Sequence, residues 1–211
     1  MKTAAFIPVK QFESSKTRLK LTRNQKIVLT ELMLKSTILT LKKCKNISSI
    51  VTISADERVE KISIYYGVKF IFSKERGVNH AVRVGDSICK KNLFNTSIVV
   101  PIDLIFLDPN ELELLLLITS KLNRCSIIVP SVRMDGTNLL IRRPFNLYET
   151  SFDNYSYYNH IQSSRETGAR TIVVKSVNLS KDLDTMDDYN NITAHPTNRL
   201  SHLISRIQNI R

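Results

Sequence analysis

Three cationic side chains stand close together near the start of the chain, in a loop that follows an apolar segment. The apolar segment covers residues 3–7 and ends at Pro8, and Lys10, Lys16 and Arg18 come next. The loop contains no glycine, so its capacity to bind phosphate rests on cationic side chains rather than on a tight backbone turn. Further hydroxyl donors stand at Ser14, Ser15 and Thr17. The stretch predicts a phosphate-binding loop, with a solvated basic loop opening a helix as the structural alternative.

Three carboxylates stand where they could hold a divalent metal ion. Asp103 follows the apolar segment 98–102, and Asp182 and Asp184 occupy alternate positions later in the chain. Alternate residues of an extended segment share one face, so these last two carboxylates would lie side by side. Three clustered negative charges are costly unless a cation neutralises them, and oxygen ligands suit Mg²⁺ bound to substrate phosphates. Turns and helix caps are the structural alternatives for these aspartates.

Polar side chains in two turns and in a tyrosine-rich segment are candidates for substrate contacts. Asn79 stands in a turn that leads into a helix, where its amide could meet a base or a ribose, or simply cap the helix. An Asp-Gly pair at 135–136 is typical of a hairpin turn, and Thr137 and Asn138 add donors that such a turn does not need. Ser151, in the tyrosine-rich segment, is a further hydroxyl donor.

The other titratable residues show no recognisable site. The histidines lack metal-ligand or triad spacing and are interpreted as surface or packing residues: His80, His160, His195 and His202. The cysteines are odd in number and widely spaced, so we expect reduced packing thiols at Cys44, Cys89 and Cys125. Structural roles at helix starts are expected for Asp108, Asp187 and Asp188.

Length and charge narrow the class of protein. The chain has 211 residues and a formal net charge of +12, and its length suits a single domain over residues 1–211. This charge is compatible with phosphorylated small molecules, acidic membranes or nucleic acid, but no dense basic run is present, which disfavours nucleic acid. The longest apolar run, 112–118, is too short to span a membrane, and we identify no signal peptide, so we expect a cytoplasmic protein.

The spacing of apolar residues predicts strands and helices in alternation. Strands are predicted at 3–8, 48–54, 68–72, 96–101 and 125–130, with helices between them at 24–43, 56–66, 78–91 and 109–121. This alternation is typical of an α/β fold with a mostly parallel sheet, in which ligands bind at the carboxyl ends of the strands. The basic loop and Asp103 both follow such ends, so we expect them to converge.

The pattern changes after Pro130. Short strands are predicted at 139–142 and 171–175, on either side of the tyrosine-rich segment 148–158. We expect that segment to form a flap over the site. Apolar residues at helical spacing predict a C-terminal helix over about 198–211, packed on the body of the protein or on a partner subunit.

The candidate motifs, in this order, make the chain resemble the 2-phospho-L-lactate guanylyltransferases of coenzyme F-420 biosynthesis, including relatives that use phosphoenolpyruvate or 3-phosphoglycerate. The resemblance spans Phe6 to Tyr189. The motifs that carry it are Ile7-Pro8-Val9-Lys10, Ser15-Lys16-Thr17-Arg18-Leu19, Gly77-Val78-Asn79-His80-Ala81, Pro101-Ile102-Asp103-Leu104, Asp135-Gly136-Thr137-Asn138-Leu139, Ser151-Phe152 and Asp182-Leu183-Asp184-Thr185. It implies a Rossmann-like three-layer α/β/α nucleotidyltransferase fold with a mostly parallel mixed sheet, and a homodimer.

The resemblance also implies roles for individual residues. It implies that Lys10, Lys16 and Arg18 are catalytic groups that contact the GTP triphosphate or the acceptor phosphate. It also implies that these three residues bind the nucleotide together with Pro8 and Asn79. It assigns a Mg²⁺ ion to Asp103, Asp182 and Asp184. It assigns the acceptor carboxylate or phosphate to Thr137, Asn138 and Ser151.

The chain departs from the family pattern at three places, and these changes are assigned to the acceptor flap. Ile105 stands where the family usually has proline, Tyr148 and Glu149 stand where a glycine is usual, and Tyr155 stands where a histidine is expected. The expected reaction transfers GMP from GTP to a small phosphorylated carboxylic acid and releases pyrophosphate. The alternatives are a nucleotidyltransferase for a sugar phosphate or another acceptor, and a non-catalytic basic nucleic-acid-binding protein.

Overall fold

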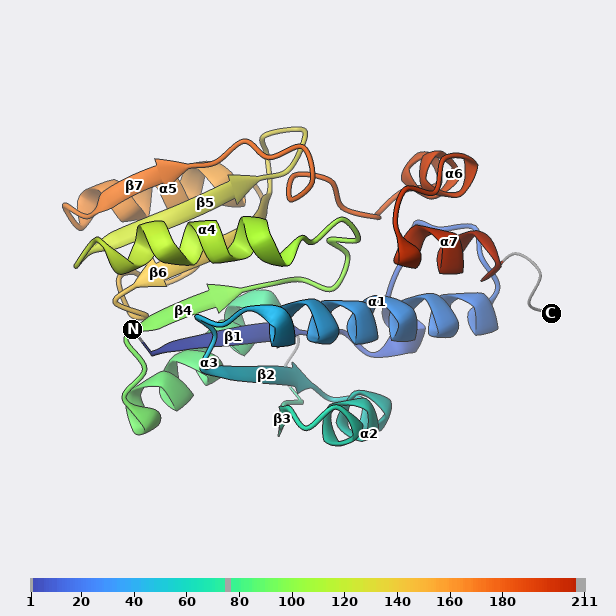
Figure 1. The fold of residues 1–211 in the computed structure, drawn as a ribbon, viewed down its shortest axis with the longest axis horizontal. Coiled ribbons are helices and arrows are strands. Elements are labelled where there is room, and N and C mark those ends of the chain that lie inside the picture. Colours follow the sequence, from blue (N-terminus) through green and yellow to red (C-terminus); the bar gives the residue numbers. More distant parts are fainter. Residues whose placement is uncertain (1, 75–76, 208–211) are drawn as a thin grey trace.

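A seven-stranded sheet forms the centre of the molecule, in a computed structural model that describes residues 2–74 and 77–207 (Figure 1). The strand order is β3-β2-β1-β4-β6-β5-β7. The strands are β1 (Thr3–Pro8), β2 (Ser49–Ser54), β3 (Lys69–Phe72), β4 (Thr96–Val99), β5 (Cys125–Pro130), β6 (Thr137–Arg143) and β7 (Arg170–Val173).

Helices connect the strands and extend beyond the last one. They are α1 (Arg23–Lys43), α2 (Glu57–Tyr65), α3 (Val78–Asn92), α4 (Pro109–Ser120), α5 (Ser156–Glu166), α6 (Met186–Ala194) and α7 (Arg199–Ser205), with a short 3-10 turn η1 (Phe12–Ser14) after β1. The expected alternation of strands and helices up to Pro130 is confirmed, with bounds that differ by a residue or two. The expected capping role of Asp108 is confirmed, because its carboxylate accepts from the backbone of Asn110 and Glu111 at the start of α4.

Strand directions decide which loops meet. β1, β2, β3 and β4 run parallel, β6 runs antiparallel between β4 and β5, and β7 is parallel to β5. Because Val99 pairs with Leu140 and Pro130 pairs with Thr137, the start of β6 lies at the edge where β4 and β5 end. The predicted mostly parallel mixed sheet is confirmed, and this edge gathers the loops after β1 and β4 together with the β5–β6 turn.

Apolar residues of the strands alternate between two helix layers. Ala5 and Ile7 belong to the core cluster beneath α1 and α4, whereas Phe6 packs in the opposite layer with α3. Figure 1 shows α1 and α4 across the front of the sheet, with α3 and α5 behind it. A Cβ atom at Gly85 of α3 would lie 2.7 Å from the ring of Phe6, so only glycine permits this close approach. The predicted three-layer arrangement is confirmed.

The region after β6 differs from the sequence prediction. The tyrosine-rich segment 148–158 is only partly a loop, because its last three residues begin helix α5 at Ser156. The expected C-terminal helix is described as α7, which ends at Ser205, and residues 208–211 lie outside the described part of the chain. Figure 1 shows α6 and α7 beside the N-terminal end of α1, at the carboxyl edge of the sheet.

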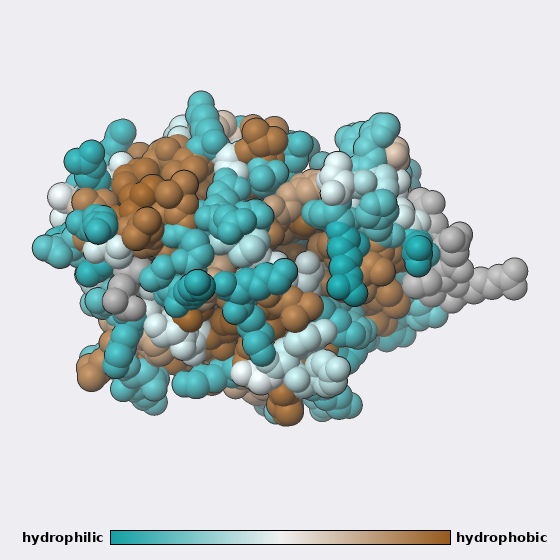
Figure 2. Space-filling model, in the orientation of Figure 1, coloured by the Kyte–Doolittle hydropathy of each residue, from teal (hydrophilic) through white to brown (hydrophobic). Residues whose placement is uncertain are grey.

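The cysteines are buried, and a few apolar side chains are exposed on the surface. The three cysteines are buried and free, as expected. Exposed side chains of α4 give the face in Figure 2 an apolar patch, at Leu114, Leu117 and Ile118. In the described part of the chain, none of the helices is long and apolar enough to cross a membrane.

Candidate active site

An open cavity of about 2600 Å³ lies at the carboxyl edge of the sheet. Its wall is built from the loop after β1, the loop after β4, the β5–β6 turn, the start of α5 and the segment that precedes α6. Most of the site residues expected from the sequence line it, namely Pro8, Lys10, Lys16, Arg18, Asp103, Thr137, Asn138, Asp182 and Asp184. Elements far apart in the sequence therefore converge on one cavity, as predicted from the position of the polar motifs.

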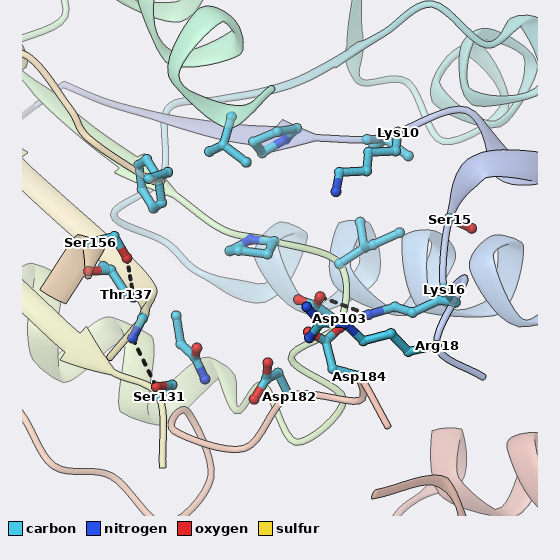
Figure 3. Close-up of a pocket in the computed structure, with 18 of the residues that line it drawn as sticks. Lys10, Ser15, Lys16, Arg18, Asp103, Ser131, Thr137, Ser156, Asp182 and Asp184 are labelled. Atoms are coloured by element: carbon cyan, nitrogen blue, oxygen red, sulfur yellow. Dashed lines mark hydrogen bonds and ion pairs between the residues drawn. The ribbon is translucent and has the colours of Figure 1, made fainter. Parts of the chain in front are cut away.

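Lys16 lies between two of the predicted metal-binding carboxylates. Its Nζ atom is 2.9 Å from Oδ2 of Asp103 and 2.8 Å from Oδ1 of Asp184 (Figure 3). Burial alone would lower the pKa of Lys16, but the two carboxylates outweigh burial and raise it, so the ammonium group stays charged. Lys16 also has a left-handed backbone, with φ of 52°, which the surrounding contacts must stabilise.

Asp182 completes a cluster of three carboxylates. Burial, followed by the negative charges of Asp103 and Asp184, raises the pKa of Asp182 to about 6. The pKa of Asp184 is shifted the other way: burial raises it, but the charge of Lys16 and its hydrogen bond outweigh burial and lower it. The cluster thus holds more negative charge than the single ammonium group of Lys16 balances.

A backbone contact brings the carboxylates together. Leu183 donates its N–H to the carbonyl oxygen of Asp103 at 3.1 Å, and its side chain is fully buried in the core. Asp182 and Asp184, on either side of Leu183, both line the cavity, whereas the side chain of Leu183 lies in the core. The expected shared face of these two aspartates is confirmed by the contact of Asp184 with Lys16 and by the influence of both neighbours on Asp182.

The basic loop is anchored by a buried aspartate that sequence analysis did not single out. Asp56, the N-cap of α2, accepts the backbone N–H of Phe12 at 2.9 Å and is held on both carboxylate oxygens by Arg58. The Ser15 hydroxyl contacts the carbonyl of Phe12 and the hydroxyl of Thr30 in α1. Ser15 is therefore an anchor of the loop, and the side chain of Ser14 lies outside the described part.

Lys10 and Arg18 place further positive charge on the carboxylate cluster. Both line the cavity, and their charges contribute to the lowered pKa of Asp184. Figure 3 shows Arg18 beside Lys16 and Asp184, with Lys10 pointing into the cavity from the opposite wall. Three cations and three carboxylates thus surround one end of the cavity, an arrangement that can hold a polyphosphate together with a divalent cation.

Thr137 and Ser156 define the other end of the cavity. Figure 3 shows them at a distance from the lysines, with Asp182 between the two groups. The hydroxyl of Ser156 accepts the backbone N–H of Thr137 at 2.8 Å. Asn138 donates its amide to the carbonyl of Leu179 at 3.2 Å, so this predicted acceptor contact also fastens the segment that leads to the aspartates.

His160 was interpreted from the sequence as a surface or packing residue, and the structure gives it more contacts than that. It is fully buried, with one ring nitrogen 2.9 Å from the hydroxyl of Thr137 and the other 3.0 Å from the backbone N–H of Ser151. Its ring stacks edge-on against Phe152, at 4.7 Å between centroids. Burial, and then the charge of Arg142, lowers the pKa of His160 to about 3, so the ring is neutral.

Asn79 and Ser151 belong to the flap rather than to the cluster of charges. Oδ1 of Asn79 accepts the N–H of Phe152 at 2.7 Å, and its amide nitrogen donates to Asp153 at 3.0 Å. The hydroxyl of Ser151 accepts from the amide of Asn159 at 3.2 Å. Asn79 thus connects the start of α3, expected to recognise the nucleotide, with the flap expected to cover the acceptor.

The three aspartates fit a magnesium ion, although they do not form a ready-made cage. Among the residues that the structure describes, no group of three His, Cys, Asp or Glu side chains converges at metal-binding geometry. Mg²⁺ requires few protein ligands, since it keeps several waters and is shared with substrate phosphates. The carboxylate oxygens are the donor chemistry that such an ion needs, and a bound cation would offset the burial and the like charges of Asp103 and Asp184 that raise the pKa of Asp182.

The fold is that of nucleotidyltransferases. A structure from Desulfovibrio desulfuricans G20 described as a nucleotide-diphospho-sugar transferase matches with a TM-score of 0.77 at 12% identity, over 99% of this chain and 96% of that chain. A cytidylyltransferase from Leptospira borgpetersenii matches with a TM-score of 0.62 at 14% identity, over 99% of this chain and 94% of that chain. At such low identity the likeness establishes the architecture only.

The chain belongs to the guanylyl transferase CofC-like family, whose model matches residues 3–207. A 2-phospho-L-lactate guanylyltransferase from Methanothermobacter thermautotrophicus is 30% identical, over 92% of this chain and 86% of its own length. A 3-phospho-D-glycerate guanylyltransferase from Colwellia psychrerythraea is 28% identical, over 89% of this chain and 90% of its own length. A phosphoenolpyruvate guanylyltransferase from Conexibacter woesei is 27% identical, over 89% of this chain and 86% of its own length. The resemblance expected from the motifs is confirmed.

Proposed function

We propose that this protein transfers GMP from GTP to the phosphate of a small phosphorylated carboxylic acid, in the biosynthesis of coenzyme F-420. The observation that carries the proposal is the ion pairing of Lys16 with both Asp103 and Asp184. Lys10 and Arg18 line the same cavity. Family membership supports guanylyl transfer, because curated relatives act on 2-phospho-L-lactate, 3-phosphoglycerate and phosphoenolpyruvate.

In the proposed reaction, a phosphate oxygen of the acceptor attacks the α-phosphorus of GTP. The bond from the α-phosphorus to the bridging oxygen breaks, and pyrophosphate leaves with that oxygen and its electron pair. A new phosphoanhydride then joins GMP to the acceptor, so no nucleophile from the protein is required. Two anions must approach each other, and Lys10, Lys16 and Arg18 lower their repulsion and stabilise the charge that develops on the leaving group.

Asp103, Asp182 and Asp184 would hold a magnesium ion in this mechanism. The ion would supply positive charge to the triphosphate and lower the barrier to phosphoryl transfer. Lys16 is already in contact with two of these aspartates, so its ammonium group is placed to balance the cluster and to reach the phosphates. Pro8, which lines the cavity, would contribute to its nucleotide side, and Asn79 would act there through the flap residues that it binds.

The acceptor would occupy the end of the cavity near β6 and α5. Thr137, Asn138 and Ser151 are the proposed acceptor contacts, and of these Thr137 and Asn138 line the cavity. The three relatives' acceptors share a phosphate and a carboxylate within a few bonds, so the acceptor class is proposed rather than one acid. We also propose that the enzyme is cytoplasmic and acts as a homodimer without nucleic-acid or membrane partners.

Pyrophosphate release from the purified protein tests the proposal. Each nucleoside triphosphate would be combined with Mg²⁺ and with 2-phospho-L-lactate, phosphoenolpyruvate or 3-phosphoglycerate, alongside acceptor-free controls. The expected result is release that requires GTP together with one of these acids and is lost when the metal is chelated. Release with none of these pairs, or release only when a sugar phosphate is supplied as the acceptor in a parallel assay, would contradict the proposal.

A further inference from the structure

His160 is held in one tautomer by its two hydrogen bonds. The backbone N–H of Ser151 can only donate, so Nε2 of His160, at 3.0 Å, must be the unprotonated nitrogen. The ring is neutral, as its burial requires, so its single proton is on Nδ1. That N–H donates to the hydroxyl oxygen of Thr137 at 2.9 Å.

The tautomer of His160 decides what the hydroxyl of Thr137 offers to a ligand. With a lone pair occupied by His160, the hydroxyl proton of Thr137 is left to donate elsewhere. Thr137 is only 7% exposed and lines the cavity, and within the described residues its hydroxyl has no second protein partner. The opposite tautomer would take the proton of Thr137 and leave lone pairs facing the cavity, which would repel an anion.

Ser156 repeats this arrangement beside Thr137. Its hydroxyl oxygen accepts the backbone N–H of Thr137 at 2.8 Å, and no other protein partner is seen for it in the described part of the chain. Ser156 is 3% exposed, lines the cavity and is the first residue of α5. Two almost buried hydroxyl groups therefore stand together at the cavity wall, each already accepting a hydrogen bond and each left with a proton to donate.

We propose that Ser156 joins Thr137, which the resemblance already assigns to the acceptor, in binding the acceptor carboxylate, and that His160 is a positioning residue that orients Thr137 as a donor. This inference rests on the proposed function and assigns one part of the acceptor to one end of the cavity. The cations around Lys16 face the acceptor phosphate, and the hydroxyl pair lies on the other side of Asp182 in Figure 3, so the carboxylate faces the hydroxyl pair. Two donors also match the two oxygens of a carboxylate.

Ser156 and Ser151 have different roles in this assignment, although the resemblance pointed to Ser151 as the acceptor contact. The hydroxyl of Ser151 accepts from Asn159, and its N–H is used by His160. Ser151 therefore shapes the support of the hydroxyl pair, whereas Ser156, five positions later, lies in the cavity wall itself.

Kinetics of serine and histidine variants test this inference. Ser156→Ala and His160→Phe are each expected to raise KM for the acceptor by about ten- to a hundredfold, with KM for GTP unchanged, because a hydrogen bond to a charged group is lost. His160→Gln, which keeps a donor and an acceptor, should restore part of the acceptor affinity. Ser164→Ala is the matched control, since Ser164 lies in the same helix and bonds to Thr171 instead.

The outcomes separate this inference from the proposed function. If the wild-type protein releases no pyrophosphate with any acceptor, guanylyl transfer itself fails. If the wild type is active and Ser156→Ala leaves KM for the acceptor unchanged, or raises both KM values equally, the hydroxyl pair is not the carboxylate site. Should Ser156→Ala not fold, as judged by thermal unfolding, Ser156→Cys keeps the volume but is a poor donor, and the same KM comparison decides.

Discussion

Leu183 donates its backbone N–H to the carbonyl oxygen of Asp103 at 3.1 Å, which joins the segment before α6 to the loop after β4. Leu183 is fully buried, so this segment is held by packing as well as by hydrogen bonding. Its two neighbours, Asp182 and Asp184, are thereby fixed in front of Asp103, and Lys16 closes the group from the other side. The geometry of the charged cluster thus depends on an apolar residue.

Leu183→Ala should therefore weaken both the fold and the site. Removal of a fully buried leucine side chain is expected to lower the free energy of unfolding by about 2–5 kcal/mol. Because Asp182 and Asp184 flank it, turnover should fall even at temperatures where the variant is folded. Urea unfolding measures the first effect, and pyrophosphate release at a temperature well below the midpoint measures the second. Full turnover in a destabilised variant would show that the cluster does not depend on this anchor.

Asp103→Asn should abolish turnover while the fold is kept. The substitution removes one carboxylate from Lys16 and from the proposed metal, but it leaves the carbonyl contact with Leu183 intact. Asp108→Asn is the matched control, because Asp108 caps α4 and asparagine caps equally well. Pyrophosphate release and thermal unfolding of both variants check this. Retained Mg²⁺-dependent activity in Asp103→Asn would remove Asp103 from the reaction.

Lys16→Met should cost both activity and stability. It leaves Asp103 and Asp184 facing each other without their shared cation, and the free energy of unfolding should fall by about 1–3 kcal/mol. The loss stays below that of a fully buried pair because the side chain of Asp184 is 43% exposed, so water screens its charge. Addition of Mg²⁺ should raise the melting temperature of this variant more than that of the wild type. An equal response of the two proteins would argue against a metal at these aspartates.

Asp56→Asn should loosen the basic loop. Asp56 holds the N–H of Phe12 and the guanidinium of Arg58 through a buried carboxylate. The loss of its charge should raise KM for GTP, because Lys10 and Lys16 would no longer be preorganised. Glu13→Gln is the control, since Glu13 contacts Arg58 from an exposed position. Steady-state kinetics with GTP as the varied substrate compare the two, and similar KM values would refute the anchoring role.

The buried His160 predicts how stability depends on pH. Its pKa is lowered to about 3 by burial and by Arg142, whereas an unfolded histidine titrates near its ordinary value of about 6.5. The unfolded chain therefore binds a proton that the folded chain does not, and stability falls as pH drops below about 6.5. Above about pH 6.5 the full contribution of His160 to stability is present. Between about pH 6.5 and the folded pKa, the free energy of unfolding falls by about 1.4 kcal/mol for each pH unit.

Urea unfolding of the wild type and of His160→Gln, between pH 7 and pH 5, isolates this contribution. The other titrating groups are the same in both proteins, so their contributions cancel. Tyr148, whose ring centroid lies 6.0 Å from that of His160, stays neutral in this range because burial raises its pKa to about 12. The wild type should lose stability more steeply than the variant. Parallel pH dependences would show that His160 becomes protonated without cost.

Much of the fold followed from local patterns in the chain. The alternation of Ala5 and Ile7 with Phe6 is a strand pattern, and Thr22 and Asp108 cap the helices that they precede. Helix α5 as a whole was not predicted, and its N-cap gives no sequence signal: Tyr155 has a left-handed conformation and makes no side-chain capping bond. Propensity and capping rules use only residues that are neighbours in sequence. A helix that begins without a capping side chain is therefore not predicted by them.

The amino-acid sequence by itself determined the alternation of strands and helices, the family, and the set of cations and carboxylates at the strand ends. Only the tertiary structure decided which of these side chains touch: Lys16 meets Asp103 across 87 positions and Asp184 across 168. His160 likewise meets Thr137 across 23 positions, although its spacing indicated no site. Such contacts arise from strand order and burial, which bring distant residues together and set their charge states, and neither is written in the local sequence pattern.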